Sequence, residues 1–252
     1  MQPIILYDIP SKAPNAIWAP NPAKTRQVAQ SKPDYCMFCL EYKGLLYTIV
    51  WVEFKDIPLT MKTLGASTTE GGRYTLPVIK DPNTGSIVAE SLAIAEYLDK
   101  TYPEKPIIPR GANALIWLFE PAYCSVAYGK VVKLILTKTL EIMNDSSREY
   151  FIRTRLELLG ETRWETVSEE NVQQQWEEFK KGLDEIDKWY QKSGGKWIMG
   201  DTFSFADMVV ACRTMWWNKI FDEEQLRELH SWNGGRWARV LADVNAECGT
   251  DL

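Results

Sequence analysis

The chain has 252 residues, with 29 Lys and Arg against 34 Asp and Glu, which gives a formal net charge of −5. Its composition, 45% hydrophobic and 25% charged, is ordinary for a globular protein. A nucleic-acid partner is not expected, because phosphate binding normally needs a basic face. A single histidine, His230, is too few for a histidine-rich metal site, and it limits any nucleophile–histidine pair to one position.

No segment has the pattern of an export signal or a membrane span. The apolar start, residues 4–6, is stopped by Asp8 and Pro10, and the apolar stretch 114–132 is interrupted by charged residues and a proline. Five cysteines are an odd number, which favours reduced thiols over a disulfide framework. We therefore expect a cytoplasmic protein without a membrane partner.

The first hundred residues contain four candidate strands. Residues 3–9 form the first. Residues 48–54 (TIVWVEF) are β-branched and aromatic with little polar relief, which predicts a strand buried on both faces. Residues 76–81 and 86–90 predict two more strands, joined by the hairpin sequence Asp-Pro-Asn-Thr-Gly.

A helix follows the last of these strands. Leu92, Ala95 and Leu98 fall on one helical face until Tyr102-Pro103 ends the pattern. The next residues, up to Pro109, are rich in proline and read as a linker. We therefore divide the chain into an α/β domain over residues 1–103 and an all-α domain over residues 104–252.

The second part carries helical signals and no convincing strand. Its clearest helix runs over residues 169–192, with an apolar stripe repeating every three or four residues. A second helix start is indicated by Ser204 and Asp207, which form a capping box. The stripe of the first helix consists of Val172, Trp176, Phe179, Leu183, Ile186 and Tyr190.

Leu76-Pro77-Val78 at a strand entrance is the first candidate site. A cis Leu76-Pro77 bond would turn the backbone of Val78 outward to pair with an extended peptide ligand. The alternative is an ordinary proline that begins a strand, because only about 5–6% of X-Pro bonds are cis.

Glu90-Ser91, where a strand meets a helix, is the second candidate site. With Ser91 as the N-cap, free backbone N–H groups and a hydroxyl suit a carboxylate, while Glu90 offers a charge for an ammonium group. Together they suit the α-amino-acid end of a ligand, such as a γ-glutamyl group. The alternative is that Ser91 only caps its helix and Glu90 is solvated.

Several segments occur in a specific order along the chain: LPVI at 76–79, ES at 90–91, YLDKTYP at 97–103 and GDTFSFAD at 200–207. In this order the chain resembles a cytosolic glutathione transferase. Three further segments, LYDIP at 6–10, WAPN at 18–21 and REYF at 148–151, are more narrowly similar to the fungal class A, or etherase-related, transferases.

The resemblance implies a thioredoxin-like first domain that binds glutathione and an all-helical second domain with a hydrophobic acceptor site. It also implies a homodimer. Carried over, Val78 after a cis Pro77 would pair with the cysteinyl part of glutathione, and Glu90 and Ser91 would hold its γ-glutamyl end. The implied reaction is attack of the glutathione thiolate on a small hydrophobic or aromatic electrophile.

The chain departs from this family at the residue that assists the thiolate. Ala19 stands in the glutathione-binding loop where the fungal class generally has a thiolate-donating serine. Asn21, backbone N–H groups or Ser11 could donate instead. A protein that captures aromatic compounds with little turnover is therefore the alternative function.

A second departure is a lengthening of twelve residues, 27–38. It is either a genuine extension of the first helix or a retained short intron, and sequencing the mature transcript distinguishes the two. The segment creates a C-x-x-C pair, Cys36 and Cys39, which invites a redox interpretation. Its position far past the first strand favours accidental spacing.

Nine of the eleven tryptophans lie in the predicted helical part, where the family binds its acceptor. Most are expected to be core residues. Trp216 and Trp217 are neighbours and are not expected to face the core together, since adjacent helical residues point about 100° apart. Trp18, beside the expected glutathione site, is the better candidate for a pocket wall, and one of Trp216 and Trp217 is a further candidate for holding an aromatic guest.

Overall fold

In this computed structural model, residues 1–10, 38–160 and 169–249 are described. One sheet has the strand order β2-β1-β3-β4, in which β1 is parallel to β2 and antiparallel to β3, and β3 is antiparallel to β4. The four predicted strands and their hairpin are confirmed. The strands are β1 (Ile4–Asp8), β2 (Tyr47–Trp51), β3 (Val78–Asp81) and β4 (Ser86–Ala89).

The prediction that the second strand is buried on both faces was wrong. β2 lies at the edge of the sheet, and Val50 and Trp51 are 40% and 41% exposed. A run of β-branched and aromatic residues indicates a strand but does not tell a central strand from an edge strand. The two central strands are β1, whose residues Ile4, Leu6 and Asp8 are buried, and β3.

The sheet separates two apolar clusters, because side chains of a strand alternate between its faces. Leu6 and Ile79 belong to the larger cluster, together with residues of helices α2 (Phe38–Lys43) and α4 (Ser91–Thr101). Val78 belongs to the smaller cluster, with residues of α3 (Ile57–Leu64). The larger cluster continues into the helical part of the chain, whereas the smaller one takes in residues of only two of the following helices.

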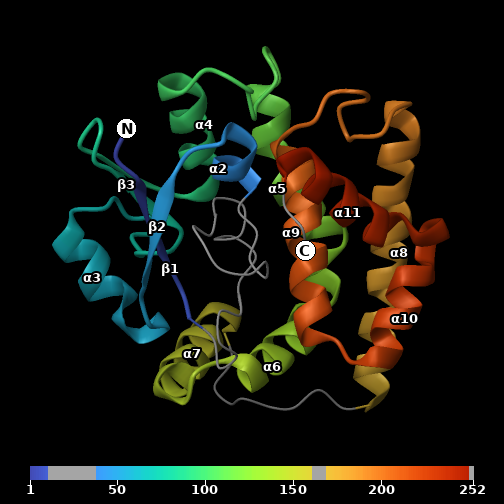
Figure 1. The fold of residues 1–252 in the computed structure, drawn as a ribbon. Helices are drawn as coiled ribbons and strands as arrows, with labels where there is room; N and C mark the ends of the chain where they lie inside the picture. The colour runs from blue at the N-terminus through green and yellow to red at the C-terminus, as the bar shows by residue number, and fades with distance from the viewer. Residues whose placement is uncertain (11–37, 161–168, 250–252) are drawn as a thin grey trace.

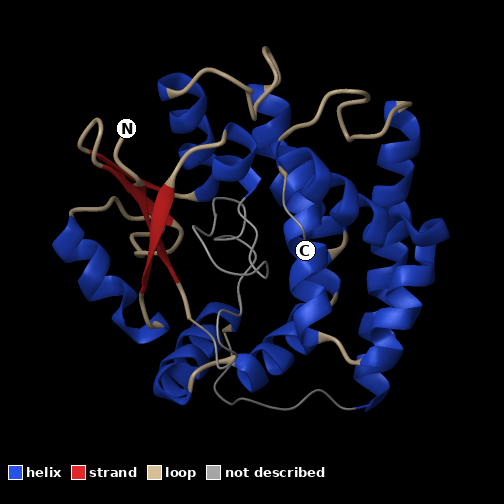
Figure 2. Cartoon of the chain, in the orientation of Figure 1, coloured by secondary structure: helices blue, strands red, loops and turns tan. Residues whose placement is uncertain are grey.

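Beyond β4 the described chain is helical apart from two isolated β-bridges, as Figure 2 also shows. The prediction of an α/β part followed by an all-helical part is confirmed, and Figure 1 shows the two side by side. None of the described helices is long and apolar enough to cross a bilayer. The remaining helices are α5 (Asn113–Val126), α6 (Val132–Ile142), α7 (Asp145–Leu159), α8 (Glu169–Ser193), α9 (Phe205–Ile220), α10 (Glu223–Ser231) and α11 (Arg236–Cys248).

The segment between α4 and α5 is fixed by an ion pair. Asp99 accepts hydrogen bonds from the backbone N–H groups of Ile107 and Ile108, and its carboxylate lies 2.7 Å from Nζ of Lys43. Ile107 in turn accepts a hydrogen bond from the backbone N–H of Phe205, at the start of α9. The linker is therefore tied both to the sheet-bearing part and to the helices.

The predicted helical stripe and capping box are confirmed. In α8, Trp176, Phe179 and Leu183 are buried, and the Asp207 carboxylate accepts hydrogen bonds from the backbone N–H and the hydroxyl of Ser204.

The expectation that Trp216 and Trp217 do not share the core was wrong, since both are almost fully buried. Helix α9 is packed on all sides, with only Asn218 and Lys219 outside the buried set, so angular separation along the helix does not bring either tryptophan to the surface.

Candidate functional site

The Leu76-Pro77 peptide bond is cis, as the sequence allowed. It lies where the loop after α3 enters β3. Val78 is fully buried and is paired with Tyr7 of β1 on one side and Ala89 of β4 on the other. Its backbone therefore has no open edge for a ligand, which does not fit the outward pairing expected of it. The residue at this entrance that borders open space is Leu76.

Glu90 has a positive φ of 73° and stands one residue before α4, whose first residue is Ser91. The expected cap is therefore displaced by one position, since Glu90 and not Ser91 occupies the N-cap and no side chain caps the helix there. Ser91 is buried, while the exposed Glu90 accepts a 2.5 Å hydrogen bond from the hydroxyl of Thr75. This bond connects Glu90 to the segment that carries the cis bond.

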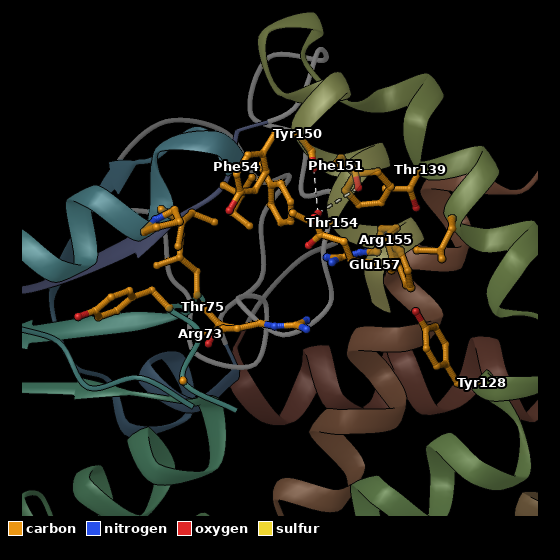
Figure 3. A pocket seen from close by; sticks show the side chains of 18 of the residues that line it. Phe54, Arg73, Thr75, Tyr128, Thr139, Tyr150, Phe151, Thr154, Arg155 and Glu157 are labelled. Atoms are coloured by element: carbon orange, nitrogen blue, oxygen red, sulfur yellow. Dashed lines mark hydrogen bonds between the residues drawn. The ribbon is translucent and has the colours of Figure 1, made fainter. Parts of the chain in front are cut away.

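A cavity of about 650 Å³ opens beside this junction, between the sheet-bearing part and helices α6, α7 and α9. Figure 3 shows it with Thr75 and Arg73 on one side and the residues of α7 on the other. Its walls are mostly apolar and aromatic, as in many small-molecule sites. The apolar and aromatic lining comprises Ile9, Phe54, Ile57, Pro58, Tyr74, Leu76, Tyr128, Leu136, Tyr150, Phe151 and Trp216.

Arg155 of α7 lines the cavity and packs on two aromatic rings. Its guanidinium lies over the rings of Phe54 and Phe151, with centroid distances of 5.2 and 4.8 Å. Burial is the main cause that lowers the pKa of Arg155 below its ordinary value, and the positive charge of Arg73 adds to it. Two guanidinium groups therefore act on each other across the same cavity.

Arg213 forms the floor of the cavity. It is almost fully buried, lies 3.2 Å from a carboxylate oxygen of Glu120, and its guanidinium is 4.4 Å from the ring centroid of Tyr128. The ring of Trp216 packs beside Tyr128 at 6.0 Å. Of the two tryptophans singled out in α9, Trp216 borders the cavity, whereas Trp217 packs edge-on against Phe179 in the core.

Several predicted site residues lie outside the described part of the chain. They include Trp18, Ala19 and Asn21, so their roles stay predictions. Of the suspect segment 27–38, only Phe38 is described, and it is fully buried at the start of α2. Of the C-x-x-C pair only Cys39 is described, and its buried sulfur lies 3.6 Å from the sulfur of Met208.

His230 lies away from the cavity. Its Nε2 is 2.9 Å from the amide oxygen of Asn218, and it is absent from the cavity wall. Within the described ranges, no group of three His, Cys, Asp or Glu side chains is arranged to hold a metal ion.

The sequence reasoning missed the arginines of the cavity. Arg73 comes from the loop before β3, and Arg155 follows Phe151 by one helical turn in α7. Arg155 lies four residues after Phe151 and packs over its ring, and this helical spacing is visible in the sequence beside the REYF segment. Nothing local indicated that this segment faces Arg73.

Two family models match the chain. The glutathione S-transferase C-terminal domain model matches residues 114–246, and the glutathione S-transferase N-terminal domain model matches residues 35–101. The matched ranges correspond to the helical part and to most of the sheet-bearing part.

Several solved structures are similar to this one. A glutathione S-transferase of Ceriporiopsis subvermispora, crystallised in complex with glutathione, is 33% identical, with 98% of each chain covered and a TM-score of 0.87. Glutathione transferase GSTFuA3 from Phanerochaete chrysosporium is 34% identical, with 100% of this chain and 99% of that chain covered and a TM-score of 0.83. A curated relative, the glutathione S-transferase-like protein ustS of Aspergillus flavus, is 29% identical over 93% of this chain and 87% of its own length.

Proposed function

Because this chain belongs to the glutathione S-transferase family, we propose that it binds glutathione beside the cis Leu76-Pro77 bond and transfers it to small hydrophobic or aromatic electrophiles. The observation that carries the proposal is the meeting of three features at one place. The cis bond, the Glu90-Ser91 helix start and an aromatic-walled cavity adjoin one another.

Glutathione has two kinds of contact available at this junction. The exposed Glu90 carboxylate suits the α-ammonium of the γ-glutamyl group, and the first backbone N–H groups of α4 with Ser91 suit its carboxylate. We assign the backbone that pairs with the cysteinyl part to Leu76 in place of Val78, because Leu76 borders the cavity and Val78 lies between two strands.

The chemical task is to keep the glutathione sulfur ionised. A free thiol with a pKa of about 8.5 is only about 3% thiolate at pH 7. Each unit of pKa lowering needs about 1.4 kcal/mol of preferential thiolate stabilisation. The thiolate then forms a sulfur–carbon bond with the electrophile, and the leaving group departs with the electrons of the broken bond. Asn21, Ser11 and backbone N–H groups remain the candidate donors to the sulfur.

A ligand-binding protein without efficient turnover is the second candidate. The observation that favours it is Ala19, which has no hydroxyl to donate to a thiolate. The cavity would then capture aromatic compounds in the same place.

The glutathione site is tested with immobilised glutathione. We expect the wild-type protein to be retained, and Glu90→Gln to lose retention because it removes the charge that faces the ammonium group. The matched control is Glu96→Gln, a change at an exposed glutamate inside the adjoining helix α4, which should leave retention unchanged. Equal retention of both variants would remove Glu90 from the site, and no retention of the wild type would refute glutathione binding.

Turnover separates the two functions. The purified protein is assayed with glutathione and an activated aryl halide, and separately with a hydroperoxide. Conjugation or peroxide reduction above the uncatalysed rate supports a transferase, whereas retention on glutathione without turnover supports the binding protein.

A further inference from the structure

Four charged side chains line the cavity: Arg73, Arg155, Arg213 and Glu157. Arg213 is neutralised by its ion pair with Glu120. In the part of the chain that the structure describes, neither Arg73 nor Arg155 forms an ion pair, including with the exposed Glu157. The two sides of the cavity therefore each present a positive group, Arg73 and Arg155, whose charge is not compensated by these residues.

The side chain of Arg155 and the backbone of Arg73 are both held by contacts. Arg155 is fixed between the rings of Phe54 and Phe151. Arg73 ends a short turn that begins at Thr69. The backbone N–H of Thr69 donates to the Arg73 carbonyl, and the backbone N–H of Arg73 donates to the Thr69 hydroxyl. Figure 3 shows the Arg73 side chain extending into the cavity toward the side that carries Arg155. Like charges brought together at a site favour an anion between them.

We propose that Arg73 and Arg155 bind the carboxylate of an aromatic acceptor, so that acidic aromatic compounds are the preferred second ligand of this cavity. A guanidinium matches a carboxylate with paired N–H donors, which makes it more selective than a simple charge. The rings of Tyr128, Tyr150 and Trp216 supply the apolar surface for the aromatic part. The proposal depends on the proposed function in one respect, namely that this ligand is the electrophile that accepts glutathione.

The volume agrees with one such ligand. A cavity of about 650 Å³ lies within the range of about 300–1,000 Å³ that small-molecule sites occupy. A carboxylate could also come from glutathione itself, through its glycine end, since Arg73 stands three residues before Leu76. The test must separate these two sources.

The test measures binding of 3-phenylpropanoate and of the neutral 3-phenylpropanamide by isothermal titration calorimetry, with glutathione absent. The two probes differ mainly in charge. We expect the acid to bind about tenfold more tightly than the amide, as one charge-assisted pair predicts. Equal affinity of the two probes for the wild-type protein would overturn the inference without any variant.

Variants then locate the charge. Arg155→Gln and Arg73→Gln should each reduce the acid-to-amide preference, and Arg155→Lys should restore part of it, because the charge returns without the fork. Arg227→Gln is the control, since Arg227 is an exposed arginine of α10 that does not line the cavity. A preference that survives both glutamine variants would refute the assignment.

A second arm compares glutathione with its glycine amide. If the arginines hold the glycine carboxylate, Arg155→Gln and Arg73→Gln will abolish the preference for glutathione over its amide. The acid and amide phenylpropanoid probes will then bind with equal affinity. This outcome would overturn the acceptor assignment. If the protein prefers the acid probe but does not bind glutathione, the proposed function fails and the carboxylate site stands.

Discussion

Glu90 is a non-glycine residue in the left-handed region, with φ 73° and ψ 130°. Such a conformation costs on the order of 1–3 kcal/mol and persists only where the surroundings impose it. Here it turns the chain from β4 into α4 and leaves the carboxylate exposed beside Thr75. Because glycine would adopt this conformation more easily, the presence of glutamate agrees with a role for its side chain in binding.

We predict that Glu90→Gly has a free energy of unfolding about 1 kcal/mol higher than that of Glu90→Ala. Both variants lose the same side-chain contacts, so the difference isolates the backbone strain. Urea unfolding measures it. The same two changes at Glu96, inside α4, should give the opposite order, because alanine favours a helix over glycine by about 1 kcal/mol. An alanine variant as stable as the glycine variant at position 90 would show that no strain is stored there.

The start of helix α9 depends on one buried carboxylate. Asp207 accepts hydrogen bonds from the backbone N–H groups of Ile198 and Ser204, at 2.9 and 3.1 Å, and from the Ser204 hydroxyl. Burial outweighs these hydrogen bonds and raises the pKa of Asp207 to about 6. The capping box therefore carries a charge that the surroundings only partly stabilise at neutral pH.

This pKa predicts the pH dependence of stability. The folded protein binds the Asp207 proton more tightly than the unfolded chain, whose carboxyl has its ordinary pKa of about 3.9. The contribution of Asp207 to the free energy of unfolding should therefore fall as the pH rises from about 4 to about 6, by on the order of 3 kcal/mol.

Chemical denaturation of wild type and Asp207→Asn across this pH range measures the effect. As the pH rises, the free energy of unfolding of the wild type should fall relative to that of the variant, since asparagine does not titrate. A difference that is constant with pH, or that shifts toward the wild type, would contradict the raised pKa.

The elements that local patterns predicted correctly are those whose signals lie within one segment. The stripe of α8 and the Ser204–Asp207 box follow from spacing alone. The edge position of β2 and the burial of Trp217 could not be predicted this way, because they depend on which other elements pack against them.

The candidate site divides in the same manner. Pro77, Glu90 and Ser91 were found because a cis-prone proline and a helix start are visible in a few residues. Arg73 and Arg155 were not found, because their shared cavity is created by segments about eighty residues apart. The sequence thus indicated the side of the candidate site proposed to bind glutathione and gave no signal for the side proposed to bind the acceptor.

At the scale of the whole molecule, Glu53 joins the two walls of the cavity. Its carboxylate accepts hydrogen bonds from the Asn144 side chain at 2.7 Å and from the Ser147 hydroxyl at 2.6 Å, both at the start of α7. Glu53 immediately precedes Phe54, whose ring packs on Tyr150 and Phe151 of α7, so the carboxylate and the ring contacts together join the two walls. This contact holds the helical part against the sheet-bearing part.

We predict that Glu53→Ala lowers the free energy of unfolding by about 1–3 kcal/mol, because it leaves the almost fully buried Ser147 hydroxyl without this partner. Glu53→Ala should also weaken binding of 3-phenylpropanoate and 3-phenylpropanamide by the same factor, since it loosens the wall without removing the arginines. A double-mutant cycle with Ser147→Ala, followed by urea unfolding, should give a coupling of about 1 kcal/mol. Additive effects in the cycle would mean that the two walls are held by other contacts. In the binding experiment, weaker binding of the acid probe alone would mean that Glu53 acts on the charge of the site as well as on its shape.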